Sequence, residues 1–245
     1  MILKFGLIII GDELLFGKRD DQHQKRFRTL LTQHDMQLNR CWLLPDEAVS
    51  LTKHLVFSMS EELPVFVCGG IGATPDDLTR ACAAEASGVP LERHEEARKL
   101  IEKRFAGEAY PTRILMADLP RGCELIPNPY NQIPGFTINR HHFLPGFPEM
   151  AWPMAEWVLE NCYPSSHGTI RERSLRVLNT PESQLVSLME EMNSHYADLK
   201  LFSLPQLGNE GNIELGIRGE GDIDGAFAAL QEALHSRGIP FHPSN

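Results

Sequence analysis

The fold is decided by residues 64–79, which read PVFVCGGIGATPDDLT. The apolar residues 64–68 predict a short buried strand, and glycines occupy three of the next four positions. Thr74 is a good N-cap, and Pro75 suits the first position of a helix. The stretch therefore predicts a strand, a glycine-rich loop and a helix whose first amides point outward as donors to an anion.

Apolar patterns on either side of this stretch predict an alternation of strands and helices. Strands are expected at residues 2–10, 38–44 and 64–68, with helices at 20–35 and from residue 48 onward between them. Further helices are expected at 76–87, 94–105 and 148–161. The segment 108–147 contains six prolines and predicts loops and edge strands. This order predicts an α/β fold with a mostly parallel sheet and right-handed crossovers.

A second, smaller unit is expected after a linker at residues 162–168. Its elements are three strands and two helices, at 170–178, 199–203, 212–218, 182–194 and 222–236. Gly208 and Gly211 form a GxxG pattern, but the loop is acidic and joins two strands, so we interpret it as a hairpin turn. The predicted domains are residues 1–163, an α/β domain, and residues 168–245, an α+β domain.

Charge and composition narrow the classes of partner. The chain of 245 residues has 23 Lys and Arg against 33 Asp and Glu, a formal net charge of −10. Such a protein repels phosphate backbones, so nucleic acid is not an expected partner. The aliphatic run at residues 7–10 is too short to span a membrane, and no signal-peptide cleavage site follows it. We expect a cytoplasmic protein that binds no membrane.

The cysteines and histidines give no sign of a metal centre. The five cysteines include no CxxC pair, which predicts reduced thiols rather than a zinc site or a disulfide framework. His141 and His142 are adjacent, so on a strand their rings would lie on opposite faces of the sheet and could not share a metal.

Three unusual loops each follow a predicted strand, at residues 11–17, 69–77 and 144–148. The carboxyl ends of parallel strands lie at one edge of a sheet, where open α/β folds bind ligands. A phosphorylated ligand in this acidic protein would need backbone amides and a cation. Mg²⁺ takes one or two carboxylates and bridges to phosphate oxygens, and Asp76 and Asp77 with acids of the first loop are candidates.

A purely structural reading of the middle loop remains open. The sequence from Thr74 to Asp77 is a sound capping box, and acids in a first helical turn gain about 0.3–1 kcal/mol from the helix dipole without any ligand.

The motifs in these loops resemble those of the MoaB/Mog molybdopterin-binding domain family, and most of all its CinA (competence/damage-inducible protein A) branch. GDELLFG at residues 11–17 is similar to the family's G-[TD]-E-L-L-x-G. GGIGATPDDLT at 69–79 is similar to GG-[IL]-G-P-T-x-D-D-x-T. Asn128-Pro129 and the LPGFP of residues 144–148 match two further motifs, and the second module resembles the KH-like domain that follows in CinA.

The resemblance implies a three-layer α/β domain that binds a phosphorylated nucleotide or pterin. It also implies Mg²⁺-dependent cleavage of ADP-ribose-like diphosphates, a homo-oligomer, and a site that can be assigned residue by residue. The catalytic and metal-binding residues would be Asp77, Asp76 and Glu13. The residues that bind the phosphate and the rest of the ligand would be Gly69, Gly70, Ile71, Gly72, Ala73, Thr74, Asp12, Asn128, Pro145 and Gly146.

Some residues depart from the family pattern, so two alternatives to the hydrolase function stay open. Leu115 and Met116 stand where the CinA branch has Lys-Gln, and Arg113 is the candidate substitute cation. The alternatives are a binding module that has lost its chemistry, and pterin adenylylation in molybdenum cofactor biosynthesis. The 245 residues leave no room for the nicotinamide-nucleotide deamidase domain of many CinA proteins, so that activity is not expected.

Overall fold

The structure, a computed structural model, describes residues 2–164, 171–205 and 212–243. By its internal contacts the chain forms two compact units, and one of them spans Leu3–Ser166. The predicted linker at 162–168 lies partly outside the described residues, so the exact domain bounds stay a prediction. None of the helices in the described ranges is long and apolar enough to cross a membrane.

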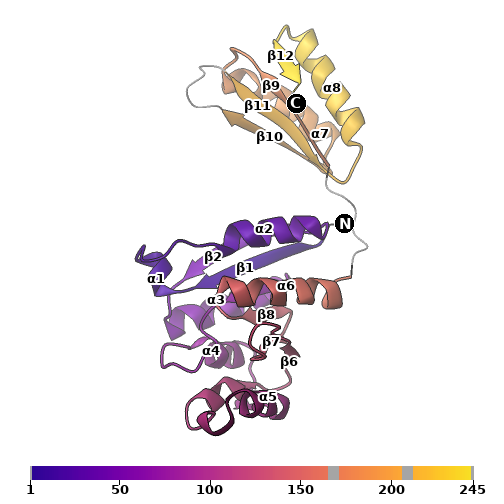
Figure 1. Cartoon of the computed structure of the whole chain (residues 1–245). Coiled ribbons are helices and arrows are strands. Elements are labelled where there is room, and N and C mark those ends of the chain that lie inside the picture. Colours follow the sequence, from indigo (N-terminus) through magenta and orange to yellow (C-terminus); the bar gives the residue numbers. More distant parts are fainter. Residues whose placement is uncertain (1, 165–170, 206–211, 244–245) are drawn as a thin grey trace. The chain divides into compact units, whose positions relative to one another are not determined.

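A six-stranded sheet forms the centre of the larger unit (Figure 1), in the order β2-β1-β3-β8-β7-β6. The strands in that order are Gln37–Leu44, Lys4–Ile10, Val65–Cys68, His141–Leu144, Gly135–Ile138 and Glu124–Ile126. The first four are parallel to one another, and β7 runs antiparallel to both of its neighbours, β8 and β6. The prediction of an α/β fold with a mostly parallel sheet is confirmed.

Helices cover both faces of this sheet. The alternation along β1 shows why, since Leu7 and Ile9 lie in one apolar cluster and Ile8 and Ile10 in another. The first cluster is covered by α2, His23–Gln33, and α6, Pro148–Cys162. The second is covered by α3, α4 and α5, at Ala48–Ser60, Thr79–Ala86 and Glu95–Phe105. The three layers expected from the family resemblance are therefore present.

Short elements complete the unit. They are the helix α1, Asp12–Leu15, two 3₁₀ helices, Ala106–Glu108 and Arg113–Ala117, and the two-stranded sheet of β4, Leu91–Arg93, and β5, Asp118–Pro120. The two adjacent histidines on β8 do face opposite sides, as predicted. His141 Nε2 is 2.8 Å from Ser58 Oγ on α3, whereas His142 Nε2 is 2.9 Å from the hydroxyl of Tyr163.

The smaller unit is an antiparallel sheet of order β10-β11-β9-β12 with helices packed on one face. In chain order its elements are β9 Arg171–Val177, a 3₁₀ turn Glu182–Gln184, α7 Val186–His195, β10 Leu199–Pro205, β11 Ile213–Gly219, α8 Ile223–Ser236 and β12 Phe241–Pro243. This β-α-β-β-α-β order is that of a ferredoxin-like fold. The predicted KH-like identity is not confirmed, and the GxxG of 208–211 lies outside the described residues.

Candidate functional site

Three strand ends bring the predicted loops together at one edge of the sheet. Because β1, β3 and β8 are parallel neighbours, the loops that follow them start side by side. The Gly69 amide donates to the carbonyl of Leu144 over 3.0 Å, and a Cβ on Gly146 would lie 3.4 Å from the Cα of Gly69. The loops at 69–77 and 144–148 are therefore in direct backbone contact.

The first two glycines of the middle loop are required by its path. Gly69 has a φ of 117°, and a Cβ there would lie 2.5 Å from the carbonyl oxygen of Ile10. Gly70 has a φ of 66°, and a Cβ there would overlap the hydroxyl of Thr79. That hydroxyl donates to the Gly69 carbonyl over 2.9 Å. Only glycine lets the loop turn back this closely onto β1 and the start of α4.

Asp77 closes the loop on itself. Its Oδ1 accepts a 2.9 Å hydrogen bond from the amide of Gly72. Its Oδ2 accepts hydrogen bonds from the amide of Thr74, over 2.8 Å, and from the Thr74 hydroxyl, over 2.5 Å. The predicted helix start at Thr74 and Pro75 is wrong, since α4 begins at Thr79. The reason is that Asp77 captures the amides that were expected to point outward.

Three other amides of the loop take part in no hydrogen bond within the described ranges. Within the part of the chain that the structure describes, the backbone N–H groups of Gly70, Ile71 and Ala73 have no hydrogen-bond partner. All three residues are partly exposed. Successive free amides in a tight loop form a small concave donor set for anions. Of the loop amides expected to bind an anion, those of Gly72 and Thr74 are therefore taken by Asp77, whereas those of Gly70, Ile71 and Ala73 have no partner among the described residues.

Four carboxylates gather beside this loop, and one of them was missed from the sequence. Asp46 follows β2 at the same edge, and its Oδ2 accepts from the Asp12 amide over 3.1 Å. Partial burial is the largest cause of a raised pKa at Asp46, and the negative charges of Asp12, Glu13 and Asp76 raise it further. The hydrogen bond from the Asp12 amide acts in the opposite direction and lowers this pKa. Residues that follow parallel strands lie at the carboxyl edge of the sheet. Because β2 is parallel to β1, this rule places Asp46 at the same edge as the other loops.

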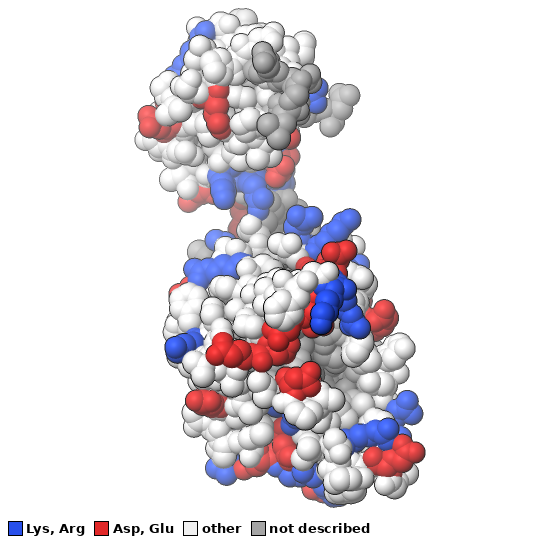
Figure 2. Space-filling view, turned by 90° about the vertical axis from the view of Figure 1, so that its left-hand side faces the viewer, with Lys and Arg blue, Asp and Glu red and all other residues white. Residues whose placement is uncertain are grey.

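Ion pairing does not neutralise the four carboxylates within the ranges that the structure describes. Among the described residues none of them forms an ion pair with Lys, Arg or His. A hydrogen bond from the Thr74 side chain lowers the pKa of Asp76, and a hydrogen bond from the backbone amide of Asp76 itself lowers it further. This exposed carboxyl therefore stays ionised. Figure 2 shows acidic side chains gathered in the middle of the face that this edge presents.

The predicted Mg²⁺ ion was tested against this donor set. In the described ranges no group of three or more His, Cys, Asp or Glu side chains is arranged to hold a metal. Asp77 already uses both carboxylate oxygens within its own loop. The remaining unpaired carboxylates are hard oxygen donors of the kind Mg²⁺ uses when one or two side chains, waters and ligand phosphates share its coordination. They fit such an ion, and they do not form a cage.

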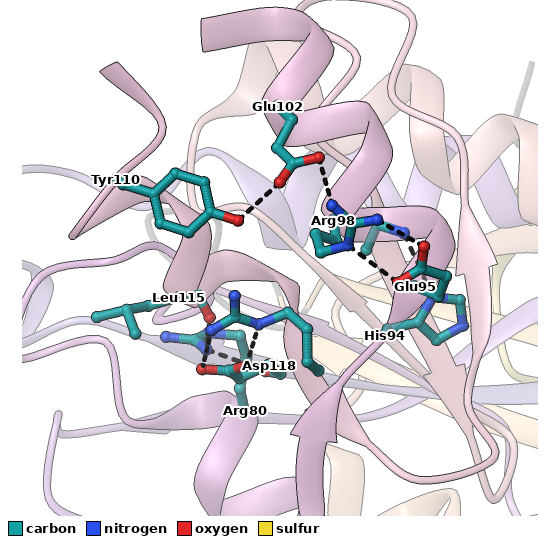
Figure 3. Close-up of polar contacts among 10 residues, drawn as sticks. Arg80, His94, Glu95, Arg98, Glu102, Tyr110, Leu115 and Asp118 are labelled. Carbon is teal, nitrogen blue, oxygen red and sulfur yellow. Dashed lines mark hydrogen bonds and ion pairs between the residues drawn. The ribbon is translucent and has the colours of Figure 1, made fainter. Parts of the chain in front are cut away.

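Arg80 lies beneath the loop and was not singled out from the sequence. It is 8% exposed, and its guanidinium donates to the carbonyl of Gly72 over 2.8 Å. It also donates to the carbonyls of Asp118, over 3.0 Å, and Leu115 (Figure 3). Burial lowers its pKa, while the charges of Asp77 and Asp118 act in the opposite direction. Arg80 thus ties the glycine-rich loop to the segment where the family has Lys-Gln.

Arg113 does not supply a cation to the loop. Its guanidinium pairs with Glu108 and lies 4.5 Å from the centre of the Phe105 ring. Leu115, at the position of the family lysine, contributes only its carbonyl to Arg80, and the residue is 40% exposed.

The loop after β8 is held by a histidine. His23, at the start of α2, is buried, and its Nε2 lies 2.9 Å from the carbonyl oxygen of Gly146. This contact fixes one of the predicted ligand-binding residues. Pro145, its neighbour, is half-buried in the same loop.

Asn128 lies on the loop between β6 and β7. Since Ile126 pairs with Gly135, and β7 runs antiparallel to β8, this loop is at the same edge of the sheet. Asn128 is 4% exposed, and its Oδ1 accepts a 3.0 Å hydrogen bond from the amide of Tyr130. Its hydrogen bonds stay within its own loop, so the structure does not connect it to the glycine-rich loop.

A parallel α/β sheet with an anion-type loop and carboxylates at its carboxyl edge defines a small-molecule-binding domain. The chain belongs to the family described as the probable molybdopterin binding domain, which matches residues 6–164. The predicted membership and the resemblance to CinA-like proteins are therefore confirmed.

Individual relatives agree with this assignment. A CinA-like protein of Citrifermentans bemidjiense (strain ATCC BAA-1014 / DSM 16622 / JCM 12645 / Bem) is 33% identical over 196 residues, 77% of this chain and 47% of that protein. A protein of Pyrobaculum calidifontis is 26% identical over 252 residues, 94% of this chain and 95% of its own length. This chain thus spans about half the length of the CinA-like relatives.

The fold is also similar to a solved structure. The protein CinA from Thermoplasma acidophilum, described as having unknown function, matches with a TM-score of 0.59 and 24% identity. The match covers 64% of this chain and 98% of the other.

Proposed function

We propose that the larger unit binds a phosphorylated pterin or nucleotide at the edge formed by the loops after β1, β3 and β8. The observation that carries the proposal is the set of amides at Gly70, Ile71 and Ala73, which have no hydrogen-bond partner among the described residues and lie beside carboxylates that form no ion pair there. Free amides bind phosphate oxygens, and a cation relieves the repulsion between phosphate and carboxylate. The family's description as a molybdopterin binding domain supports a pterin-type ligand.

The proposed reaction is Mg²⁺-dependent hydrolysis of a diphosphate such as ADP-ribose. Asp76 and Glu13 would hold the ion, which supplies charge neutralisation for the phosphates and an activated water. Asp77, expected from the sequence to hold the metal as well, keeps the loop closed and so positions the amides of Gly70 and Ala73. Arg80 holds the same loop from below.

A binding module without chemistry is the second candidate. It is favoured by Leu115 and Met116, since neither side chain can neutralise developing charge on a phosphate as Lys could. Pterin adenylylation is a third proposal, and it would need a nucleoside triphosphate as a second substrate.

The test uses the purified full chain with ADP-ribose or FAD, with and without Mg²⁺. Hydrolysis predicts nucleoside monophosphate product that requires the ion and falls at least tenfold in Asp76→Asn. Glu96→Gln is the matched control, because Glu96 is an exposed acid on α5 away from the loops. Stabilisation by these diphosphates without turnover would support the binding module instead. No product and no stabilisation by any phosphorylated pterin or nucleotide would overturn the proposal.

A further inference from the structure

A groove of about 430 Å³ in the smaller unit lies beside β10, the outer strand of its sheet (Figure 1). Four of its lining residues come from α7 and are spaced i, i+3, i+4 and i+7, so they form one stripe of that helix. The 3₁₀ turn before α7 and the strand β10 complete the lining. The residues that matter here are Glu182, Val186, Met189, Glu190, Asn193 and Ser203.

The outer edge of β10 is unpaired within the described ranges. β10 pairs with β11 on one side, without a break in register from Leu199 to Pro205, and no described strand pairs with its other side. In an antiparallel pair, every second residue directs its N–H and C=O away from the partner strand. Natural edge strands usually carry charges, bulges or prolines, but the stretch from Leu201 to Leu204 has none of them. This edge is therefore available to pair with an added strand.

The side chains of β10 show which way an added strand would face. Leu199 and Leu201 lie in the apolar core under the helices, and Ser203 continues the same face into the groove. Every second side chain of an added strand would likewise face α7. The stripe from Val186 to Asn193 is about 10 Å long, the length of about three strand residues. Two side chains, spaced two positions apart, therefore fit over it.

The groove combines negative charge with apolar surface. Within the described ranges Glu190 forms no ion pair or side-chain hydrogen bond, and Glu182 is bound only by the hydroxyl of Ser203. No lysine or arginine is among the lining residues. Val186, which is 49% exposed, and Met189 supply the apolar surface. A cationic side chain and an aliphatic one complement this lining.

We propose that the groove binds an extended segment of a partner protein, which adds as a strand to the outer edge of β10. Of two side chains spaced two positions apart in that segment, one is lysine or arginine and lies against Glu190 and Glu182. The other is aliphatic and lies against Val186 and Met189. In strand addition the backbone hydrogen bonds supply affinity and the pockets for alternate side chains supply specificity. The site lies wholly within the smaller unit and does not depend on the proposed function.

The test measures binding of end-capped seven-residue peptides to the full chain by calorimetry. One peptide is threonine throughout except for arginine at its third position and leucine at its fifth, and a second has these two exchanged, since a strand can add in either direction. We expect at least one of them to bind at least tenfold more tightly than the matched peptide with glutamate in place of arginine.

Methylation of the peptide nitrogens tests the backbone contact. Only alternate residues of an added strand donate to β10. N-methylation of the third and fifth residues, and of the second, fourth and sixth, should therefore have opposite outcomes. One pattern should abolish binding, and the other should leave most of it.

A charge reversal tests the contact with the acids. Glu190→Lys should weaken the arginine peptide at least tenfold and should bind the glutamate peptide more tightly than the original chain does, a gain that an unfolded variant could not show. Glu232→Lys is the matched control and should change neither affinity, because Glu232 is an exposed acid on α8 that does not line the groove.

Several outcomes would overturn the inference. They are equal binding of the arginine and glutamate peptides, no saturable binding of either arginine peptide, and equal effects of the two methylation patterns. Arginine amide that binds as tightly as the peptide would make the groove a site for small cations instead. A dimer in sedimentation that Glu190→Lys dissociates would assign the edge to a second copy of this chain. Loss of phosphate or diphosphate binding at the glycine-rich loop bears on the proposed function alone.

Discussion

Asp77 Oδ1 accepts a 2.9 Å hydrogen bond from the amide of Gly72, so the glycine-rich loop of this chain already contains an anion that binds one of its own amides. The same carboxylate also takes the amide and hydroxyl of Thr74. An acid at this position therefore shapes the loop before any ligand arrives, and it leaves the neighbouring amides of Gly70, Ile71 and Ala73 for an external anion.

The Asp77→Asn variant should weaken the hydrogen bonds by which residue 77 holds the amides of Gly72 and Thr74. The new Nδ2 group is a donor and would face an amide that is also a donor, and hydrogen bonds to charged groups contribute about 1.5–3 kcal/mol. We expect the free energy of unfolding of the larger unit to fall by about 2 kcal/mol, measured by urea denaturation. Asp76→Asn is the control and should change it by less than about 0.5 kcal/mol. Equal effects of the two variants would contradict a structural role for Asp77.

Substitution of the buried Arg80 should lower the free energy of unfolding more than substitution of a surface arginine. Replacement by Met leaves the carbonyls of Gly72, Leu115 and Asp118 without their donor, and each buried unsatisfied group costs about 1–3 kcal/mol. Relief of the buried charge offsets part of that cost, so we expect Arg80→Met to destabilise by about 2–4 kcal/mol in urea unfolding.

Two comparisons test that explanation. Arg80→Lys keeps the charge and some donors, and should recover about half of the loss. Arg98→Met removes exposed ion pairs with Glu95 and Glu102, which contribute about 0–1 kcal/mol in proteins generally. A loss in Arg98→Met as large as that in Arg80→Met would show that the burial of Arg80 does not decide the size of the effect.

The sequence was sufficient for the sheet but not for the details of the loop. The apolar runs at β1 and β3 are buried on both faces, so their pattern predicts a parallel sheet and places the loops at one edge. The start of α4 was misplaced because Thr74 and Pro75 satisfy the local rules for a helix start. The competing factor, capture of two amides by Asp77, depends on how the loop folds back, and propensity does not encode that.

Asp46 and Arg80 illustrate two different omissions. Asp46 could have been found, since it follows a parallel strand as the other loops do, and only the absence of glycine made its loop look ordinary. Arg80 could not, because an arginine on a predicted helix is normally a solvated side chain and its burial results from packing against residues 115–118. In the smaller unit, β12 was missed because its three residues are too short for a pattern.

Phe202 and Gly216 should be energetically coupled in that smaller unit. They are direct cross-strand partners on β10 and β11, and a Cβ on Gly216 would overlap the Phe202 ring. An aromatic ring over a strand glycine compensates for its missing side chain. We expect Gly216→Ala to destabilise by about 1 kcal/mol and Phe202→Ala by about 1–2 kcal/mol. The double variant should cost less than the sum by about 1 kcal/mol, whereas additive effects would rule out the contact.

The buried histidines of β8 should make the larger unit sensitive to acid. Burial lowers the pKa of His141 from 6.5 to about 4 and that of His142 from 6.5 to about 3. Between those values and 6.5 the unfolded chain binds protons that the folded chain does not. The stability from the neutral rings is therefore complete above about pH 6.5. It is lost as the pH falls toward about 4 for His141 and about 3 for His142, at up to about 1.4 kcal/mol per pH unit for each histidine.

Urea unfolding between pH 4.5 and 7.5 measures this slope. His142→Gln should flatten it by about half, because Gln does not titrate and can keep hydrogen bonds to Thr137 on β7 and to Tyr163 at the end of α6, the partners of His142. His34→Gln is the control, since this partly exposed side chain lies at the end of α2 outside the core and should leave the slope unchanged. A slope that persists in a double His141→Gln, His142→Gln variant would assign the acid sensitivity to other groups, such as the carboxylates around Asp46.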